Sequence, residues 1–108
     1  MQSGSEANDL AMMLARCYSG NFDLIGLRNS YHGMTQEAMG LTGMGNWKQP
    51  IPQGFGIHRV GVPSPFHGLF GTDVAKYIQE LCCVIESDTA GKIAGFICEP
   101  IQGAGGSF

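Results

Sequence analysis

The spacing of apolar positions predicts two long helices. In the first, an apolar face repeats at i, i+3, i+4 and i+7, which indicates a helix over about residues 6–19 with that face buried. The residues of this face are Leu10, Met13, Leu14 and Cys17. Gly20 follows directly and is a typical C-terminal stop.

The second long helix is predicted over about residues 73–86, with Thr72 as its N-cap. Its apolar face consists of Val74, Tyr77, Ile78, Leu81, Cys82 and Ile85. A weaker helix is predicted over about residues 35–42, where glycine lowers the helix propensity. Residues 43–56 contain Gly, Pro, Asn and Gln and are expected to form a long surface loop, which is often functional in a compact domain.

Three short segments have the pattern of buried strands. They are "DLIGL" at 23–27, "IHRVGV" at 57–62 and the centre of "KIAGFICEP" at 92–100, which is apolar on both faces. The elements therefore follow the order helix, strand, weak helix, strand, helix, strand. This alternation predicts the α/β class, with a mostly parallel sheet flanked by helices.

Composition and charge exclude several kinds of partner. The net charge is −3 and no basic stripe is present, so nucleic acid is not expected as a partner. No apolar run approaches the roughly 20 residues that span a bilayer, and neither a signal peptide nor an Arg-rich transit segment is recognisable. The four cysteines lack metal-site spacing, so no metal is expected, and three of them lie in apolar patterns as small hydrophobes. These three are Cys17, Cys82 and Cys98.

The stretch "SGSEAND" at 3–9 stands at the start of the first helix. Free N–H groups at a helix N-terminus bind phosphate well, Gly4 allows close approach of the backbone, and the Ser5 hydroxyl can donate one more hydrogen bond. The alternative is an ordinary cap, because Ser3 and Glu6 have the S-x-x-E spacing of a capping box. Taken alone, the stretch favours the cap.

Two further motifs follow predicted strands. In "NSYHG" at 29–33, Tyr31 can stack on a flat cofactor and His32 can form a hydrogen bond, although a partly buried Tyr beside a turn His is the simpler interpretation. In "CEPIQGAGG" at 98–106, Glu99 ends a buried strand and needs a partner, and Gln102 is a neutral donor and acceptor on the same turn. Glu99 can alternatively cap a helix or reach solvent.

The three motifs in this order resemble the class III aminotransferases, which bind pyridoxal 5′-phosphate (PLP) on the large domain of fold type I. The resemblance covers essentially the whole chain, and the segment from 40 to 73 is most similar to the alanine–glyoxylate aminotransferase 2 branch, particularly its plant-type members. The resemblance implies that Gly4 and Ser5 hold the cofactor phosphate and that Tyr31 stacks on the pyridine ring. His32 is the neighbour of Tyr31 in the motif, and Glu99 is implied to support the cofactor-binding network. Gln102 is also implied to belong to the cofactor site, on a weaker match to the family motif.

The resemblance also implies residues that this chain does not contain. In relatives, the lysine that binds PLP and an Asp beneath the pyridine nitrogen both follow the "EPIQG" motif. Residues 1–108 are therefore expected to be a partial PLP-binding large domain, with no small domain, no catalytic lysine and no activity alone. Met1 and Gln2 stand where relatives have the end of a strand. The lysines present, which are poor substitutes, are Lys48, Lys76 and Lys92.

The activity implied for the parent protein is transfer of an amino group from an amino acid such as alanine to an oxo acid such as glyoxylate. A homodimeric or homotetrameric parent and a mitochondrial location are implied only by the resemblance. Within the family, ornithine, acetylornithine or 4-aminobutyrate remain alternative substrates. Outside it, the alternatives are a non-catalytic mononucleotide-binding module of Rossmann type and a truncated product without a stable fold.

Overall fold

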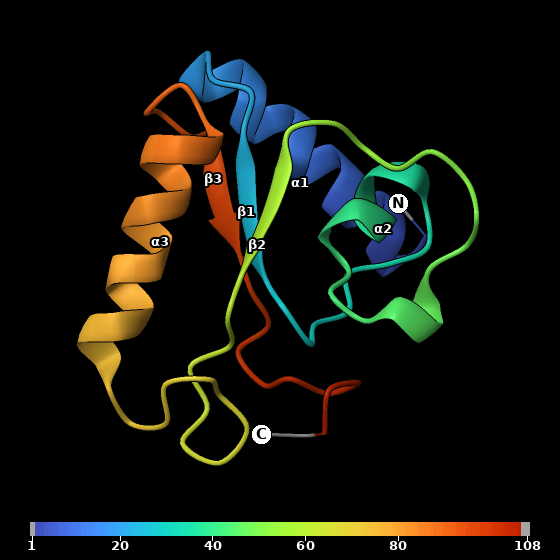
Figure 1. Cartoon of the computed structure of the whole chain (residues 1–108). Helices are drawn as coiled ribbons and strands as arrows, with labels where there is room; N and C mark the ends of the chain where they lie inside the picture. Colours follow the sequence, from blue (N-terminus) through green and yellow to red (C-terminus); the bar gives the residue numbers. More distant parts are fainter. Residues whose placement is uncertain (1, 107–108) are drawn as a thin grey trace.

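A parallel sheet of three strands lies at the centre of the computed structural model, which describes residues 2–106 (Figure 1). The strands are β1 (Leu24–Leu27), β2 (Ile57–Val60) and β3 (Gly95–Ile97), in the order β2-β1-β3. Leu24 of the central strand is in register with Ile57 on one side and with Gly95 on the other. All three strands therefore end at the same edge of the sheet.

Helices cover both faces of this sheet (Figure 1). They are α1 (Gly4–Ser19), α2 (Gln36–Leu41) and α3 (Val74–Asp88), and a short 3₁₀ helix, η1, spans Gly45–Trp47. The side chains of β1 alternate between two cores. One core contains Met12, Leu24 and Leu41, from α1, β1 and α2, and the other contains Ile25, Leu27 and Val60 with Leu81, Val84 and Ile85 of α3 packed against it.

The predicted fold class and element order are confirmed, with small shifts at the helix ends. The α1 helix begins at Gly4, two residues before the predicted start, and Gly20 ends it in the left-handed conformation at φ 70°. The predicted N-cap Thr72 is wrong, because Asp73 caps α3 by accepting a hydrogen bond from the backbone N–H of Lys76. Met1, where the resemblance places the end of a strand, lies outside the described residues.

The predicted buried face of α1 is wrong. Met13 and Leu14 are 55% and 56% exposed and Cys17 is exposed, whereas Met12 is buried. The side of α1 that faces the rest of the chain also carries polar residues, which bond to the surrounding loops. The periodicity of apolar residues therefore pointed to the wrong side, because the inward side is partly polar.

Burial at β3 is also lower than predicted. Phe96 is 43% exposed and Cys98 is exposed, because β3 is an edge strand of the sheet that the structure describes. On α3, Tyr77 is buried as predicted, but Val74 and Ile78 are 68% and 53% exposed. All four cysteines are free and exposed, so they do not act as core hydrophobes.

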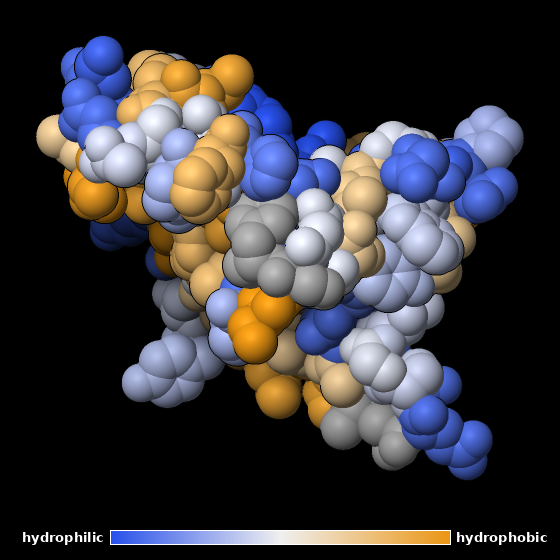
Figure 2. All heavy atoms as spheres, turned by 90° about the horizontal axis from the view of Figure 1, so that it is seen from below, coloured by the Kyte–Doolittle hydropathy of each residue, from blue (hydrophilic) through white to orange (hydrophobic). Residues whose placement is uncertain are grey.

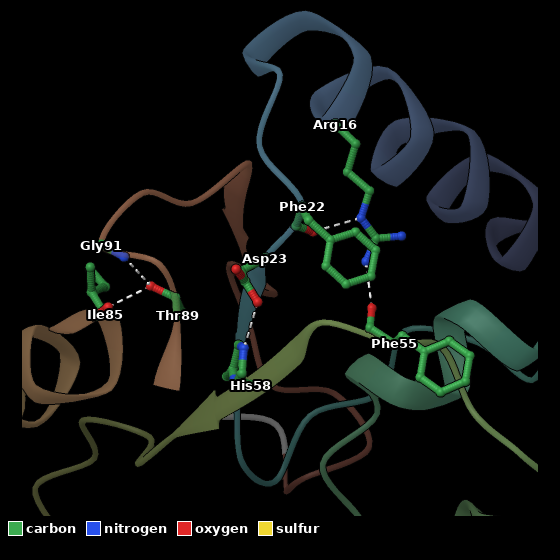
Figure 3. Close-up of polar contacts among 8 residues, drawn as sticks. All are labelled: Arg16, Phe22, Asp23, Phe55, His58, Ile85, Thr89 and Gly91. Carbon is green, nitrogen blue, oxygen red and sulfur yellow. Dashed lines mark hydrogen bonds and ion pairs between the residues drawn. The ribbon is translucent and has the colours of Figure 1, made fainter. Parts of the chain in front are cut away.

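The amino-terminal edge of the sheet is closed by polar contacts (Figure 3). Arg16 donates from Nε to the Phe22 carbonyl and from a terminal nitrogen to the Phe55 carbonyl, each at 2.7 Å. Its guanidinium lies over the Phe22 ring, 4.6 Å from the ring centroid. Asp23 Oδ1 and His58 Nε2 are 2.9 Å apart and join the starts of β1 and β2. The opposite, carboxyl-terminal edge is where parallel α/β sheets usually bind ligands.

Gly43 is expected to tolerate no side chain, since a Cβ there would lie 2.7 Å from the Leu27 carbonyl oxygen and 2.8 Å from the Asn29 nitrogen. Gly43→Ala should lower the free energy of unfolding by about 1–3 kcal/mol, because the atoms that must move are backbone. Gly45→Ala is the matched control, since nothing lies within 4 Å of its Cβ, and it should change stability by less than about 0.5 kcal/mol. Urea unfolding of both variants tests this, and equal losses would contradict the placement of Gly43.

Candidate functional site

The loops that follow β1 and β3 meet beyond the carboxyl ends of the strands, where α/β sheets usually bind ligands (Figure 1). The backbone N–H of Tyr31 donates to Glu99 Oε1 at 2.7 Å, and the Asn29 side chain donates to the Gly105 carbonyl at 3.2 Å. Glu99 Oε2 accepts a second bond, from the Gly103 N–H at 3.1 Å. The Glu99 carboxylate therefore joins two of the predicted motifs. Figure 2 shows this edge from below, with polar and apolar side chains interspersed on its surface.

The amino-terminal half of α1 is docked on the turn after β1. Asn8 donates to the His32 carbonyl at 2.6 Å, the Met34 N–H donates to Ser5 Oγ at 3.1 Å, and the Thr35 hydroxyl donates to Asp9 Oδ1 at 2.8 Å. The approach is close because residue 33 is a glycine. It has a φ of +133°, and a Cβ on it would overlap the Ser5 side chain. The structure therefore brings the first and second predicted motifs together.

The start of α1 combines a side-chain cap with free backbone donors. Ser3 Oγ accepts from the Glu6 N–H at 3.2 Å, so Ser3 is the N-cap, and Glu6 Oε2 accepts from the Gln2 N–H at 2.8 Å. The helical ladder begins with the bond from Ala7 to Ser3, which leaves the Gly4 and Ser5 amides without an intrahelical acceptor. Ser5 Oγ accepts from the Met34 N–H, and within the described part of the chain its hydrogen remains available to donate. The capping-box interpretation of this stretch is therefore confirmed, and the Gly4 and Ser5 amides are the donors that an anion site at this position would use.

Tyr31 lies against an aromatic residue that the sequence did not single out. The rings of Tyr31 and Trp47 have centroids 5.2 Å apart and planes tilted by 57°. Trp47 belongs to η1, within the long loop that was expected to be functional. A tilted contact at this distance is typical of a favourable aromatic pair.

His32 is buried and its imidazole is incompletely bonded. The side chain is 6% exposed and its Nε2 atom has no hydrogen-bond partner among the described residues. Its backbone N–H donates to the Thr42 hydroxyl at 3.1 Å. Burial lowers the pKa of His32, and the negative charge of Glu99 opposes that effect. The imidazole is therefore neutral at neutral pH, with one polar atom available for a ligand or a water molecule.

Gln102 and Glu99 both line an open pocket of about 530 Å³ at the same edge. Gln102 is 5% exposed, and its Oε1 atom has no partner among the described residues. The remaining pocket walls come from Leu27, residues 62–66, Cys98 and Pro100. Gly4, Ser5 and Tyr31 do not line this pocket. The structure thus joins Glu99 to Tyr31 directly, whereas Gln102 lies in a neighbouring hollow.

Sequence reasoning missed four residues that hold this site together. Thr42 is fully buried, and its hydroxyl contacts the His32 N–H and the Gly33 carbonyl. Asn29 has a positive φ of 60°, which Asn tolerates better than most residues. The "RNS" turn was a usable signal for Asn29. Asn8, Thr42 and Trp47 gave no signal, because their roles depend on contacts between distant segments.

The described residues contain no group of three or more side chains suited to hold a metal ion. None of the helices in this part of the chain is long and apolar enough to span a membrane.

The comparison with protein families identifies the class. The class III aminotransferase family model matches residues 1–108, so the chain belongs to this family. Its sheet and helices superpose on a PLP-bound amine transaminase from an uncultivated Pseudomonas species with a TM-score of 0.88 and 31% identity. That match covers 99% of this chain and 27% of the transaminase. The fold is therefore that of fold type I transaminases, as predicted.

Among curated relatives, the chain is similar to alanine–glyoxylate aminotransferase 2 proteins. It is 47% identical over 104 residues to the mitochondrial homolog 2 from Arabidopsis thaliana, covering 96% of this chain and 22% of the relative. It is 34% identical over 128 residues to the human mitochondrial enzyme, covering 98% of this chain and 25% of the relative. The chain thus spans about a quarter of the length of these relatives, and the resemblance seen in the sequence is confirmed at the family level.

The burial of His32 predicts a specific pH dependence of stability. Its folded pKa lies below the ordinary value of 6.5, so the unfolded chain binds a proton at this imidazole over a pH range in which the folded chain does not. The stability that His32 contributes should be present above about pH 6.5 and lost as the pH falls further. In His32→Gln this pH-dependent loss should be absent. As the pH falls from about 8 to about 5, the free energy of unfolding of the wild type should therefore decrease more than that of the variant. Urea unfolding at several pH values tests this prediction. If the free energies of unfolding of wild type and variant changed in parallel with pH, the account would be contradicted.

Proposed function

We propose that residues 1–108 are part of the PLP-binding large domain of an aminotransferase of the alanine–glyoxylate type. The observation that carries this proposal is the docking of the α1 amino end beside the turn that bears Tyr31. These contacts tie the start of α1 to the turn that carries Tyr31, just after a parallel strand. PLP has the two matching parts, a phosphate ester and a flat pyridine ring. Membership of the class III family supports the same assignment.

In this proposal the start of α1 holds the cofactor phosphate. The Gly4 and Ser5 amides donate to the phosphate oxygens, and the helix dipole adds a favourable interaction with the negative charge. Gly4 is exposed, with nothing within 4 Å of the position of a Cβ, so the backbone there is accessible. The Ser5 hydroxyl supplies a further donor, since its oxygen already accepts from Met34.

Tyr31 stacks on the pyridine ring, and Glu99 keeps Tyr31 in place. Glu99 accepts from the Tyr31 amide and also from the Gly103 amide, so it fixes the backbone of the residue that carries the ring. His32 remains neutral and offers its Nε2, which has no partner among residues 2–106, to the cofactor, the substrate or an ordered water. Gln102 contributes from the neighbouring pocket. When bound, PLP would supply the electron sink for amino-group transfer.

These 108 residues provide binding and orientation but not the reactive amine. Lys48 is held by bonds from Nζ to the Met39 carbonyl and to Gln53 Oε1, each at 2.9 Å, and burial together with the charge of Arg59 lowers its pKa. Lys76 lies 4.0 Å from Asp73, and Lys92 is exposed. We therefore expect no transaminase turnover from this chain alone. Borohydride trapping of PLP on one specific lysine, together with turnover of alanine and glyoxylate, would contradict this expectation.

The alanine–glyoxylate assignment rests on the similarity to the plant and human proteins of that name. The mitochondrial location and a homo-oligomeric parent belong to the same proposal. Relatives named 5-aminovalerate and 4-aminobutyrate aminotransferase are also similar, at 33% and 32% identity, so other amino donors are the main alternative. Substrate profiling of the longer parent would decide, and use of ornithine or 4-aminobutyrate without glyoxylate would overturn the assignment.

Binding of pyridoxamine 5′-phosphate tests the cofactor proposal on this chain, because this form of the cofactor has no aldehyde to react with surface lysines. We expect saturable binding that weakens by about tenfold or more in Ser5→Ala, since a hydrogen bond to a charged group is lost. Isothermal titration calorimetry of wild type and variant measures the effect.

Ser87→Ala is the matched control, because Ser87 is exposed at the far end of α3, and it should bind like the wild type. Adenosine monophosphate is the probe for the mononucleotide-binding alternative. Binding of this nucleotide without binding of pyridoxamine phosphate would replace the proposal by that alternative.

A further inference from the structure

Trp47 is the single tryptophan of the chain and lies against the ring proposed to stack on the cofactor. Its side chain is 42% exposed, so it lies at the surface beside Tyr31 rather than in either core. The ring of Tyr31, 5.2 Å away, is its aromatic neighbour. The backbone of Tyr31 is fixed by Glu99, but a backbone bond does not set the tilt of the ring. The contact with Trp47 can set that tilt.

The segment that carries Trp47 is tied firmly to α2. The next residue, Lys48, reaches the Met39 carbonyl and Gln53 Oε1, and the Gln49 N–H contacts the Met39 sulfur at 3.4 Å. The Trp47 N–H itself donates to the Met44 carbonyl at 3.1 Å. The carbonyls at the end of α2 attract cations, so Lys48 also satisfies the helix terminus. Trp47 is therefore held in place by its neighbours on both sides.

We infer that Trp47 is a positioning residue of the proposed cofactor site, which fixes the tilt of the Tyr31 ring so that this ring can stack on the pyridine ring. The inference rests on the proposed function and adds a residue from the loop at 43–56 to that site. Trp47 acts through Tyr31 and makes no contact with the phosphate. Its removal should therefore weaken recognition of the heterocycle and leave recognition of the phosphate unchanged.

The test compares two probes, pyridoxamine 5′-phosphate and inorganic phosphate, on the whole chain. Trp47→Ala should weaken pyridoxamine phosphate binding by about threefold to tenfold, the range expected for the loss of an aromatic pair, and should leave phosphate affinity unchanged. It should also change the induced circular dichroism of the bound probe, which reports the orientation of the heterocycle. Trp47→Phe keeps an aromatic partner for Tyr31 and should restore most of both signals.

Phe55→Ala is the control for loss of an aromatic side chain from the same loop, since Phe55 is 77% exposed at the amino-terminal edge of the sheet (Figure 3). It should match the wild type with both probes. Unchanged or tighter pyridoxamine phosphate binding in Trp47→Ala would overturn the inference and leave the proposed function intact. Equal loss of both probes would also overturn it, because that pattern indicates a structural role. A wild-type chain that does not prefer pyridoxamine phosphate to phosphate would overturn the proposed function itself.

Discussion

The docking of the α1 amino end on the turn after β1 determines the geometry of the whole candidate site. Ser5 and Asn8 contact the backbone of residues 32–34, and glycine at position 33 permits the close approach. These contacts place free amide donors beside the segment that carries Tyr31. Without them, the start of α1 would be a capped helix end that is not tied to the turn carrying Tyr31.

This constraint explains why α1 has an unusual distribution of side chains. Its contacts with the loops use polar residues, including Asn8, Asp9 and Arg16, whereas Met13 and Leu14 are largely exposed. A helix that only filled a core would show the opposite pattern. The polar contacts give direction to the docking, because each hydrogen bond fixes a particular pair of atoms, which apolar packing alone does not do.

The fold could be predicted from the sequence more completely than the site. The order of helices and strands along the chain follows from local periodicity, and β1 was recognisable because its residues are buried on both faces. The pairing of Tyr31 with Trp47, and the contact of His32 with Thr42, depend on chain segments that are separated by loops. No local pattern encodes such contacts. The inward face of α1 was mispredicted for the same reason, since its polar side chains bond to distant segments, such as the His32 and Phe55 carbonyls.

A titration of the isotope-labelled chain with pyridoxamine 5′-phosphate, followed by amide NMR spectra, tests the central claim most directly. The account predicts that the amide signals of Gly4 and Ser5 shift together with those of Tyr31 and His32, with one common dissociation constant. Shifts confined to either segment, or shifts of the two segments with different dissociation constants, would contradict the claim that they form one site.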